Sequence, residues 1–237
     1  MKIILSNPKL INSARQLRDY LNDITLTEFT VTTPDKLNPL NNVDISWGIK
    51  KKYDRIGLST VLLMEGIPSV DYNLGSPLNG LPIKYPLVIR TTLNENQGKG
   101  ITIAENFEQW FPYKDYYWSN WINFEFELGV HVINGEIVRV FKKICQDDER
   151  EFPIRNVGNN YKFSLRNIEK YKTLPDFIDK LHKVLEFEIC RYDIGWDKEN
   201  KRYVCIEANT APSLSNNFRT LEVYGNYYID KLNLQRR

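Results

Sequence analysis

Apolar residues follow two spacings along this 237-residue chain. Short apolar runs bounded by polar residues, Gly or Pro predict strands near the start, at Lys2–Ser6, Phe29–Thr32 and Asp44–Gly48. Apolar positions three or four residues apart predict a helix after the first strand and another at Arg55–Glu65, which ends at the sequence Gly66-Ile67-Pro68. A strand–helix–strand order of this kind is typical of a small α/β lobe.

The rest of the chain is dominated by strand patterns. Strands at Pro86–Arg90 and Ile101–Ala104 flank a polar loop that contains glycine, which predicts a hairpin flap. Asp176–Phe187 has its apolar residues on one face and is predicted to be an amphipathic helix. Asn134-Gly135 is a strong hairpin-turn signal. The remaining strands are expected at Tyr117–Ile122, Glu125–Ile133, Glu136–Lys143, Arg191–Trp196 and Arg202–Ala208.

Composition narrows the class of protein. Hydrophobic residues make up 42% and charged residues 26% of the chain, which is ordinary for a globular domain and argues against extensive disorder. The net charge of +2 argues against nucleic acid as a partner, although it does not exclude a local basic groove. The 3 cysteines are far apart and form no cluster with the 2 histidines, so we expect neither a disulfide framework nor a structural zinc site. Without a signal-peptide pattern or an apolar run of membrane-spanning length, we expect a cytoplasmic protein with no membrane partner.

Oxygen-bearing side chains gather on two expected strands near the C-terminus. Glu207 and Asn209 are two positions apart and therefore point to the same side of their strand, together with Cys205. If Asp193 lies on the neighbouring strand, three oxygen ligands converge, and such ligands suit Mg²⁺, which also binds phosphates. The alternative is an ordinary hairpin with solvated acids. Glu207 stands in an otherwise apolar strand, however, where an unpaired acid is costly to bury.

The segment Glu207–Pro212 resembles the C-terminal metal motif of ATP-grasp ligases, in which an Asp-bearing strand is followed by Glu-x-Asn-x-x-Pro. The resemblance implies that Asp193, Glu207 and Asn209 bind the Mg²⁺ ions that bridge the phosphates of ATP. It extends over most of the chain, and it is greatest to the small phage-associated members and to those similar to the ribosomal-protein glutamate ligase. The alternative is a generic α/β domain. It is disfavoured because several motifs agree with the family and occur in the same order.

The family resemblance also implies an organisation for the whole chain. The expected fold class is α+β, an ATP-grasp fold in which two α+β lobes clasp ATP, with a short α/β lobe at the N-terminus. On this basis residues 1–80 form the N-terminal lobe and linker, residues 81–120 the flap subdomain, and residues 121–237 the C-terminal catalytic subdomain.

The flap loop contains Gly98, Lys99 and Gly100. Glycine lets the backbone approach phosphate closely, although a plain hairpin turn is the more common meaning of such a loop. In the family the flap covers the triphosphate, and a lysine usually ends the first flap strand, where this chain has Arg90. An arginine keeps the charge and adds a fork of donors. Arg55 corresponds to a second nucleotide-binding lysine of the family, with a surface arginine at a helix start as the alternative.

The segment after the flap is similar to the family's hinge and the hairpin that follows it. The resemblance implies that the backbone of Trp121 and Ile122 meets adenine and that Glu127 meets the ribose or the second substrate. The family then has Glu-x-Arg-Val-x-Val, where this chain has Gly129 in place of an arginine that often orients substrate or phosphate.

Three further basic residues are candidates for catalysis. By the resemblance, Lys142 or Lys143 faces the phosphoryl group in transfer, and a solvated strand end is the alternative. Arg155 belongs to a stretch similar to the Arg-Asn segment of a subset of the family, and it is a candidate to hold a carboxylate or a phosphate, because the guanidinium fork matches planar oxyanions. His131 is expected to be a packing residue.

The function implied is ligation of a carboxylate to an amine, with ATP and Mg²⁺ as cofactors. A carboxylate attacks the γ-phosphate and gives an acyl-phosphate and ADP, and an amine then displaces phosphate. The substrates would be small molecules or peptides, and dimers in the family leave a homodimer open. Three alternatives remain: an ATP-grasp kinase, a non-catalytic nucleotide-binding module, and an aromatic-rich binder of single-stranded nucleic acid. No catalytic serine triad, Walker loop or Rossmann fingerprint occurs.

Overall fold

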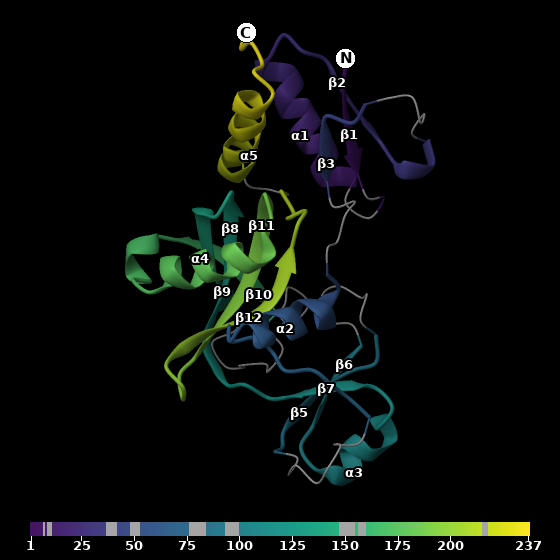
Figure 1. Cartoon of the computed structure of the whole chain (residues 1–237), viewed down its shortest axis with the longest axis vertical. Coiled ribbons are helices and arrows are strands. Elements are labelled where there is room, and N and C mark those ends of the chain that lie inside the picture. Colours follow the sequence, from purple (N-terminus) through teal and green to yellow (C-terminus); the bar gives the residue numbers. More distant parts are fainter. Residues whose placement is uncertain are drawn as a thin grey trace.

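The computed structural model describes residues 1–6, 8, 11–36, 42–47, 53–75, 84–92, 100–146, 155, 160–214 and 218–237. The described strands form three sheets that follow one another along the long axis of the molecule (Figure 1). The N-terminal sheet lies at one end with both chain termini, the five-stranded sheet lies in the middle, and the flap sheet lies at the other end. Short 3₁₀ helices span Pro34–Lys36, Phe111–Tyr113 and Ile168–Lys170.

The N-terminal sheet is parallel and has the strand order β2-β1-β3. Two helices from opposite ends of the chain, α1 and α5, pack against each other beside it (Figure 1). Their shared core contains Ile4, Leu17, Trp47 and Tyr224, all almost fully buried. The C-terminal helix therefore completes the N-terminal lobe. The elements are β1 (Lys2–Ser6), α1 (Ile11–Ile24), β2 (Phe29–Thr32), β3 (Ile45–Trp47) and α5 (Phe218–Lys231).

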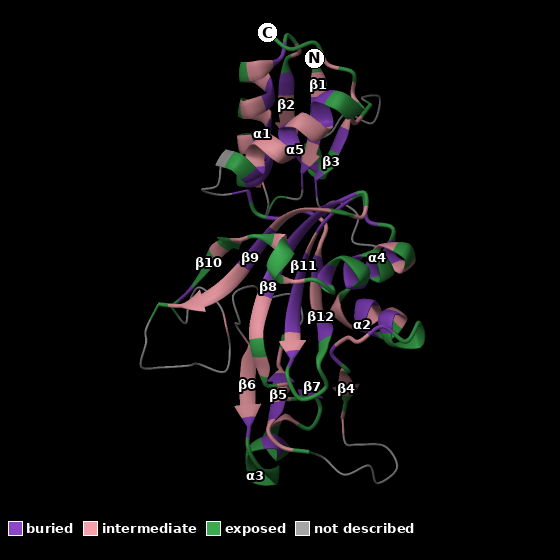
Figure 2. Ribbon diagram, turned by 90° about the vertical axis from the view of Figure 1, so that its left-hand side faces the viewer, coloured by how far each residue is buried: buried purple, intermediate pink, exposed green. Residues whose placement is uncertain are grey.

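The central sheet is antiparallel, with the strand order β10-β9-β8-β11-β12. Helices α2 and α4 lie on the same side of this sheet (Figure 2) and bury one apolar face of its strands. The turn between β8 and β9 has Asn134 and Gly135 at φ values of 48° and 84°, as expected for a tight hairpin. The elements are α2 (Arg55–Met64), β8 (Phe124–Ile133), β9 (Glu136–Cys145), β10 (Tyr161–Arg166), α4 (Leu174–Leu185), β11 (Ile189–Asp197) and β12 (Arg202–Asn209).

The flap sheet is also antiparallel and has the order β4-β7-β5-β6. Its small core holds Leu87, Ile89, Ala104, Trp110 and Trp118, whereas the aromatic side chains of Phe107, Phe111 and Tyr116 are exposed. The predicted flap hairpin is confirmed by the pairing of β5 with β6. The elements are β4 (Asn73–Leu74), β5 (Leu87–Arg90), β6 (Ile101–Ala104), α3 (Phe107–Trp110) and β7 (Tyr117–Asn120).

Two features of the fold differ from expectation. Strand β10, at the edge of the central sheet, was not predicted, although Lys162, Ser164 and Arg166 alternate there with Tyr161, Phe163 and Leu165. Helix α2 packs on the central sheet although it precedes the flap in sequence. The domain boundaries near residues 80 and 120 stay a prediction.

Candidate active site

Charged side chains of the strands gather on the face of the central sheet opposite α2 and α4, and Arg55 at the start of α2 reaches them. Strand pairing sets Asp193 beside Glu207, and Arg191 beside Asn209. The register shifts between Asp193 and the next residue, so β12 contains one extra residue there, a β-bulge. The bulge reverses the alternation of β12, and Cys205 is buried in the apolar core on the helix-covered side. The expectation that Cys205 shares a side with Glu207 is therefore wrong.

Asp193 is the most enclosed acid of the cluster, with 8% of the residue exposed. Its Oδ1 lies 3.1 Å from Arg191 Nε, and its Oδ2 lies 3.7 Å from Lys143 Nζ. Burial raises the pKa of Asp193, but Arg191 and Lys143 outweigh this and hold the pKa below its ordinary value. The carboxylate is therefore charged at neutral pH.

Lys143 links two acids on this face. Its Nζ lies 2.8 Å from Glu127 Oε2 as well as near Asp193. Burial lowers the pKa of Lys143, but the two carboxylates reverse the shift and raise the pKa above its ordinary value. Lys142 points to the other side of β9, where its Nζ lies 5.3 Å from the centre of the Phe126 ring. Of the two candidate lysines, the structure brings Lys143 to the acids and does not bring Lys142.

A second part of the cluster joins the flap to the central sheet. Arg55, at the start of α2, donates from Nη2 to Glu207 Oε2 at 2.7 Å, and its side chain is 10% exposed. The guanidinium carbon of Arg90, at the end of β5, lies 5.7 Å from the centre of the Tyr72 ring. Burial and the nearby Arg55 charge lower the pKa of Arg90, partly opposed by Tyr72. Within the described residues, the buried Arg55 Nε and Nη1 and Arg90 Nε have no hydrogen-bond partner.

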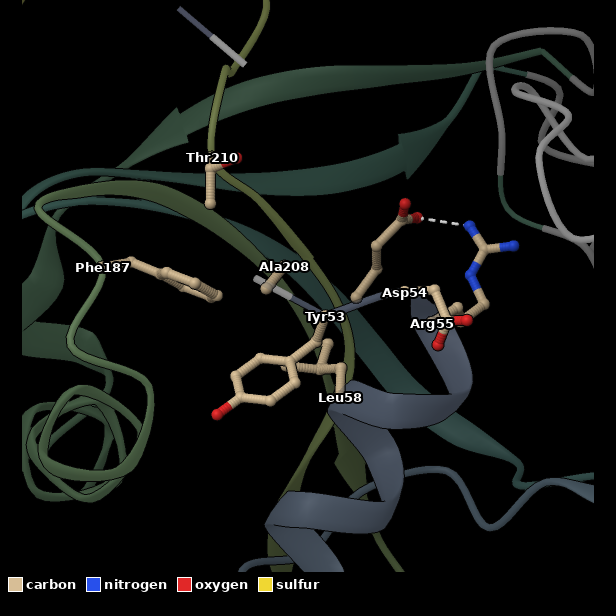
Figure 3. Close-up of a pocket in the computed structure, with 8 residues that line it drawn as sticks. Tyr53, Asp54, Arg55, Leu58, Phe187, Ala208 and Thr210 are labelled. Atoms are coloured by element: carbon tan, nitrogen blue, oxygen red, sulfur yellow. Dashed lines mark hydrogen bonds and ion pairs between the residues drawn. The ribbon is translucent and has the colours of Figure 1, made fainter. Parts of the chain in front are cut away.

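A pocket lies beside this second part, between the start of α2 and β12 (Figure 3). The Asp54 side chain caps α2 by accepting from the Gly57 N–H at 2.7 Å, which holds the adjacent Arg55 at the pocket wall. The close-up shows Arg55 on one side of the pocket and the Tyr53 ring near Leu58 on the other. The lining is Tyr53, Asp54, Arg55, Leu58, Phe187, Glu207, Ala208 and Thr210.

The other predicted residues are held mostly by backbone contacts. The Trp121 N–H donates to the Pro86 carbonyl at 2.9 Å, and the Ile122 carbonyl accepts from the Phe124 N–H at 3.0 Å, so this segment joins the flap to β8. Arg155 donates from Nη2 to the Phe124 carbonyl at 2.6 Å.

Of the predicted flap-loop residues, Gly98 and Lys99 lie outside the described residues. Gly100 has a φ of 71°, a value that favours glycine, and its carbonyl accepts from the Thr91 N–H at 2.9 Å. A side chain at this position would also collide with the Thr92 hydroxyl, because a Cβ would lie 2.4 Å from it. Glycine at position 100 is therefore required by the backbone conformation directly before β6.

Solved structures with the same arrangement cover almost the whole chain. D-alanine–D-alanine ligase from Bacillus anthracis has a TM-score of 0.68 at 12% identity, and the match covers 98% of this chain and 95% of that chain. The ATP-grasp ligase PsnB, complexed with a minimal precursor, Mg and ADP, has a TM-score of 0.69 at 8% identity, over 97% of this chain and 96% of that one. The chain has the ATP-grasp fold. The predicted α+β class is thereby confirmed, whereas no protein-family model and no curated protein matches the sequence.

The residues predicted as metal ligands of the ATP-grasp fold suit Mg²⁺. The described residues contain no group of three His, Cys, Asp or Glu side chains placed to hold a metal, so a magnesium site here would have two carboxylates, Asp193 and Glu207, and the amide of Asn209. Mg²⁺ commonly uses one or two carboxylates together with water and phosphate oxygens. The buried Asp193 Oδ1 lies 3.1 Å from Arg191 Nε but accepts no hydrogen bond from any described group, so its lone pairs are not all taken up.

Sequence reasoning missed Arg191, Tyr72 and Phe163. Arg191 could have been found, because it lies two positions before Asp193 and so shares its side of the strand. Tyr72 stands in the range 1–80 that was assigned to the N-terminal lobe and linker, and Phe163 stands in the unpredicted strand β10. No helix in the described part of the chain is long and apolar enough to cross a membrane.

Proposed function

We propose that this protein is an ATP-dependent ligase that joins a carboxylate to an amine through an acyl-phosphate and releases ADP and phosphate. The observation that carries the proposal is the buried charge cluster. Arg55, Lys143 and Arg191 form ion pairs with Glu207, Glu127 and Asp193, and the buried Arg90 of the flap lies within electrostatic reach of Arg55 and Glu207. Several guanidinium N–H groups there lack partners, which is costly unless an anionic ligand takes them up.

The residues divide by what they would contact. Arg55 and Arg90 would bind phosphate oxygens of ATP, since guanidinium forks match them. Asp193, Glu207 and Asn209 would hold Mg²⁺, which neutralises phosphate charge when bound. Lys143 lies between Glu127 and Asp193 and would stabilise charge on the phosphoryl group in transfer. The cations beside Asp193 keep this carboxylate ionised and so ready to act as a ligand.

Solved structures of the same fold support the use of ATP and Mg²⁺. Those with TM-scores of 0.63 to 0.69 include the Bacillus anthracis ligase complexed with ATP and PsnB complexed with Mg and ADP. Small-molecule or peptide acids and amines are the substrate class we propose. The absence of an arginine at Gly129 favours a second candidate, a nucleotide-binding module without turnover, which the following experiment separates from the first.

The test is calorimetric titration of ATP with and without Mg²⁺, followed by assays of ADP release with panels of acids and amines. We expect Mg²⁺-dependent binding of ATP that Glu207→Gln weakens by about tenfold or more. The substitution removes the charge of a proposed Mg²⁺ ligand that is also the ion-pair partner of Arg55. Glu188→Gln is the matched control, because Glu188 pairs with Lys231 on the surface away from the cluster.

The possible results separate the alternatives. ADP release that requires both an acid and an amine supports the ligase. A stable phosphorylated product formed without an amine indicates a kinase, and tight binding without turnover indicates the non-catalytic module. If folded wild-type protein did not bind Mg·ATP at all, every nucleotide-dependent assignment would fail.

A further inference from the structure

The charged face of the central sheet continues past the proposed metal site toward the N-terminal lobe. Strand alternation places Arg139, Phe141 and Lys143 of β9 on this face. Lys143 marks one end of the row, because it lies beside the proposed metal ligand Asp193. Arg139 marks the other end, and four residues of extended strand separate the two by roughly 13 Å.

Arg139 is a partly buried arginine that forms no ion pair with any residue the structure describes. Its Nη1 donates to the Val138 carbonyl at 3.0 Å. Its Nη2 lies 3.5 Å from the Arg219 carbonyl at the start of α5, which is long for a hydrogen bond. Its buried Nε has no hydrogen-bond partner among the described groups, and a buried N–H group without an acceptor is costly. Arg139 therefore retains donors for an anion supplied from outside.

The charges around Arg139 favour such an anion. His131 lies directly across from Arg139 on β8 and from Arg191 on β11. Burial first, and then the charges of Arg191 and Arg139, lower the pKa of His131 to about 3, with Asp193 opposing them. The Asp193 carboxylate is already paired with Arg191 and lies near Lys143. Within the described residues, the positive charge of Arg139 therefore has no carboxylate of its own.

The surface between Arg139 and Lys143 is apolar. Phe141 lies between them on β9 and is buried, and its partner on the edge strand β10 is the exposed Leu165. The exposed Phe163 lies opposite Lys143 on the same strand. Apolar side chains that gather on an exposed surface often mark a binding surface. A ligand that spans the row would thus pass over apolar side chains and meet a cation at each end.

We propose that Arg139 binds a second carboxylate of the acid substrate, one that is not activated, while the reacting carboxylate lies at the Lys143 end. The proposal rests on the proposed function and deepens it, because it makes the substrate a dianion with an apolar stem. The guanidinium fork matches a planar carboxylate. A short peptide with a free C-terminus and a linear dicarboxylic acid share this chemistry, and about four extended residues span roughly 13 Å.

A role for Arg139 in holding α5 in place is the structural alternative. In that role Arg139 would act only through the carbonyl of Arg219, and its loss would weaken all substrates alike. A binding role predicts instead that its loss affects only substrates that carry the second carboxylate. The two roles are therefore separated by a pair of ligands that differ in this one group.

The experiment uses acetylated peptides of two to four residues that begin with glutamate and end with leucine, each with a free and with an amidated C-terminus. Calorimetry measures their binding to full-length protein saturated with Mg·ADP. We expect the wild type to bind the free form of at least one peptide about tenfold or more tightly than the amide, because a charge-assisted pair forms only with the carboxylate. Linear dicarboxylic acids, namely adipate, suberate and sebacate, form a second arm, with the monoacids of the same length as controls.

Variants of Arg139 assign this preference to its side chain. Arg139→Gln should reduce the preference for the free form to within about twofold while leaving the affinity for the amide unchanged. Arg139→Lys should keep part of the preference, since it retains the charge without the fork, and it takes the place of Arg139→Gln if the latter does not fold. Arg166→Gln is the matched control, because strand pairing places Arg166 opposite Val140 on the other face of the sheet.

The results decide between the two roles. A preference for the second carboxylate that Arg139→Gln removes supports the proposal, and the arm that shows it tells a peptide from a small dicarboxylic acid. Equal affinity of the wild type for the paired ligands would overturn it, as would equal weakening of both by Arg139→Gln. Wild-type protein that binds Mg·ADP but none of these ligands would overturn it too. Wild-type protein that binds no Mg·ADP would overturn the proposed function as well, so the two failures are distinguishable.

Discussion

The two faces of the central sheet are built from the same strands and differ completely in character. Leu128, Val130 and Ile194 point toward α2 and α4 and are fully buried in an apolar core. Their immediate neighbours Glu127 and Asp193 point to the other side and form the charged cluster. Strand alternation therefore divides each strand between packing and chemistry, one residue at a time.

The two faces also differ in what they contribute to stability. Each large apolar side chain of the core contributes about 1.5–3 kcal/mol on burial. Buried ion pairs such as Lys143–Glu127 contribute little net stability, because desolvation offsets most of their attraction. The apolar face thus explains why the sheet folds, and the charged face is better explained by ligand binding.

The largest expected effect concerns the charged face. Asp193→Asn should reduce turnover by about 10²–10³-fold, since a neutral amide is a poorer magnesium ligand and the nearby cations lose their counter-charge. ADP release under saturating Mg·ATP measures it. Asp230→Asn, at an exposed position in α5, is the control and should leave the rate unchanged. Normal turnover by the Asp193 variant would remove this acid from the site.

On the apolar face, Leu128→Ala should reduce the free energy of unfolding by about 2–5 kcal/mol, because it leaves a cavity under α4. Urea denaturation measures this loss. The affinity of the folded variant for Mg·ADP should stay within about threefold of wild type, although Leu128 lies between Glu127 and Gly129 in sequence. A large loss of affinity in folded protein would show that the two faces are coupled.

His131, whose ring is buried near Arg191, makes the stability of the protein depend on pH. Burial, together with the nearby Arg191 charge, lowers the pKa of His131 to about 3, and its Nδ1 lies 2.9 Å from the Tyr224 hydroxyl. The unfolded chain, with a histidine pKa near 6.5, takes up a proton that the folded protein resists. The free energy of unfolding should therefore decrease by about 1.4 kcal/mol for each pH unit between pH 6.5 and pH 3. Urea denaturation at a series of pH values should show a shallower slope for His131→Gln, and equal slopes would contradict the prediction.

The smallest effect is expected at the surface ion pair of α4. Lys183 and Asp179 lie 2.7 Å apart, with side chains 71% and 58% exposed. Lys183→Ala should change the free energy of unfolding by less than about 0.5 kcal/mol, since solvent screens the pair. Thermal or urea denaturation tests this. A change above about 1 kcal/mol would show that this exposed ion pair contributes more to the free energy of unfolding than solvent screening allows.

Much of the local structure was predictable because it depends on neighbours in sequence. The turn at Asn134-Gly135 and the amphipathic pattern of α4 each report a conformation within a few residues. The shared side of Glu207 and Asn209 also followed from strand alternation alone. The edge strand β10 was missed although Tyr161, Phe163 and Leu165 alternate there with polar residues, and its pairing with β9 is seen only in the tertiary structure.

The sequence by itself determined which short segments are strands and helices, and that acids and basic residues stand on particular strands. Only the tertiary structure decided which of them meet. Arg55 reaches Glu207 across 152 residues because α2 packs on the central sheet. Register selected Lys143 over Lys142, and the β12 bulge turned Cys205 into the core. Arg191 lies over Gly129 because β11 pairs with β8, and spacing within one strand carries no information about the strand beside it.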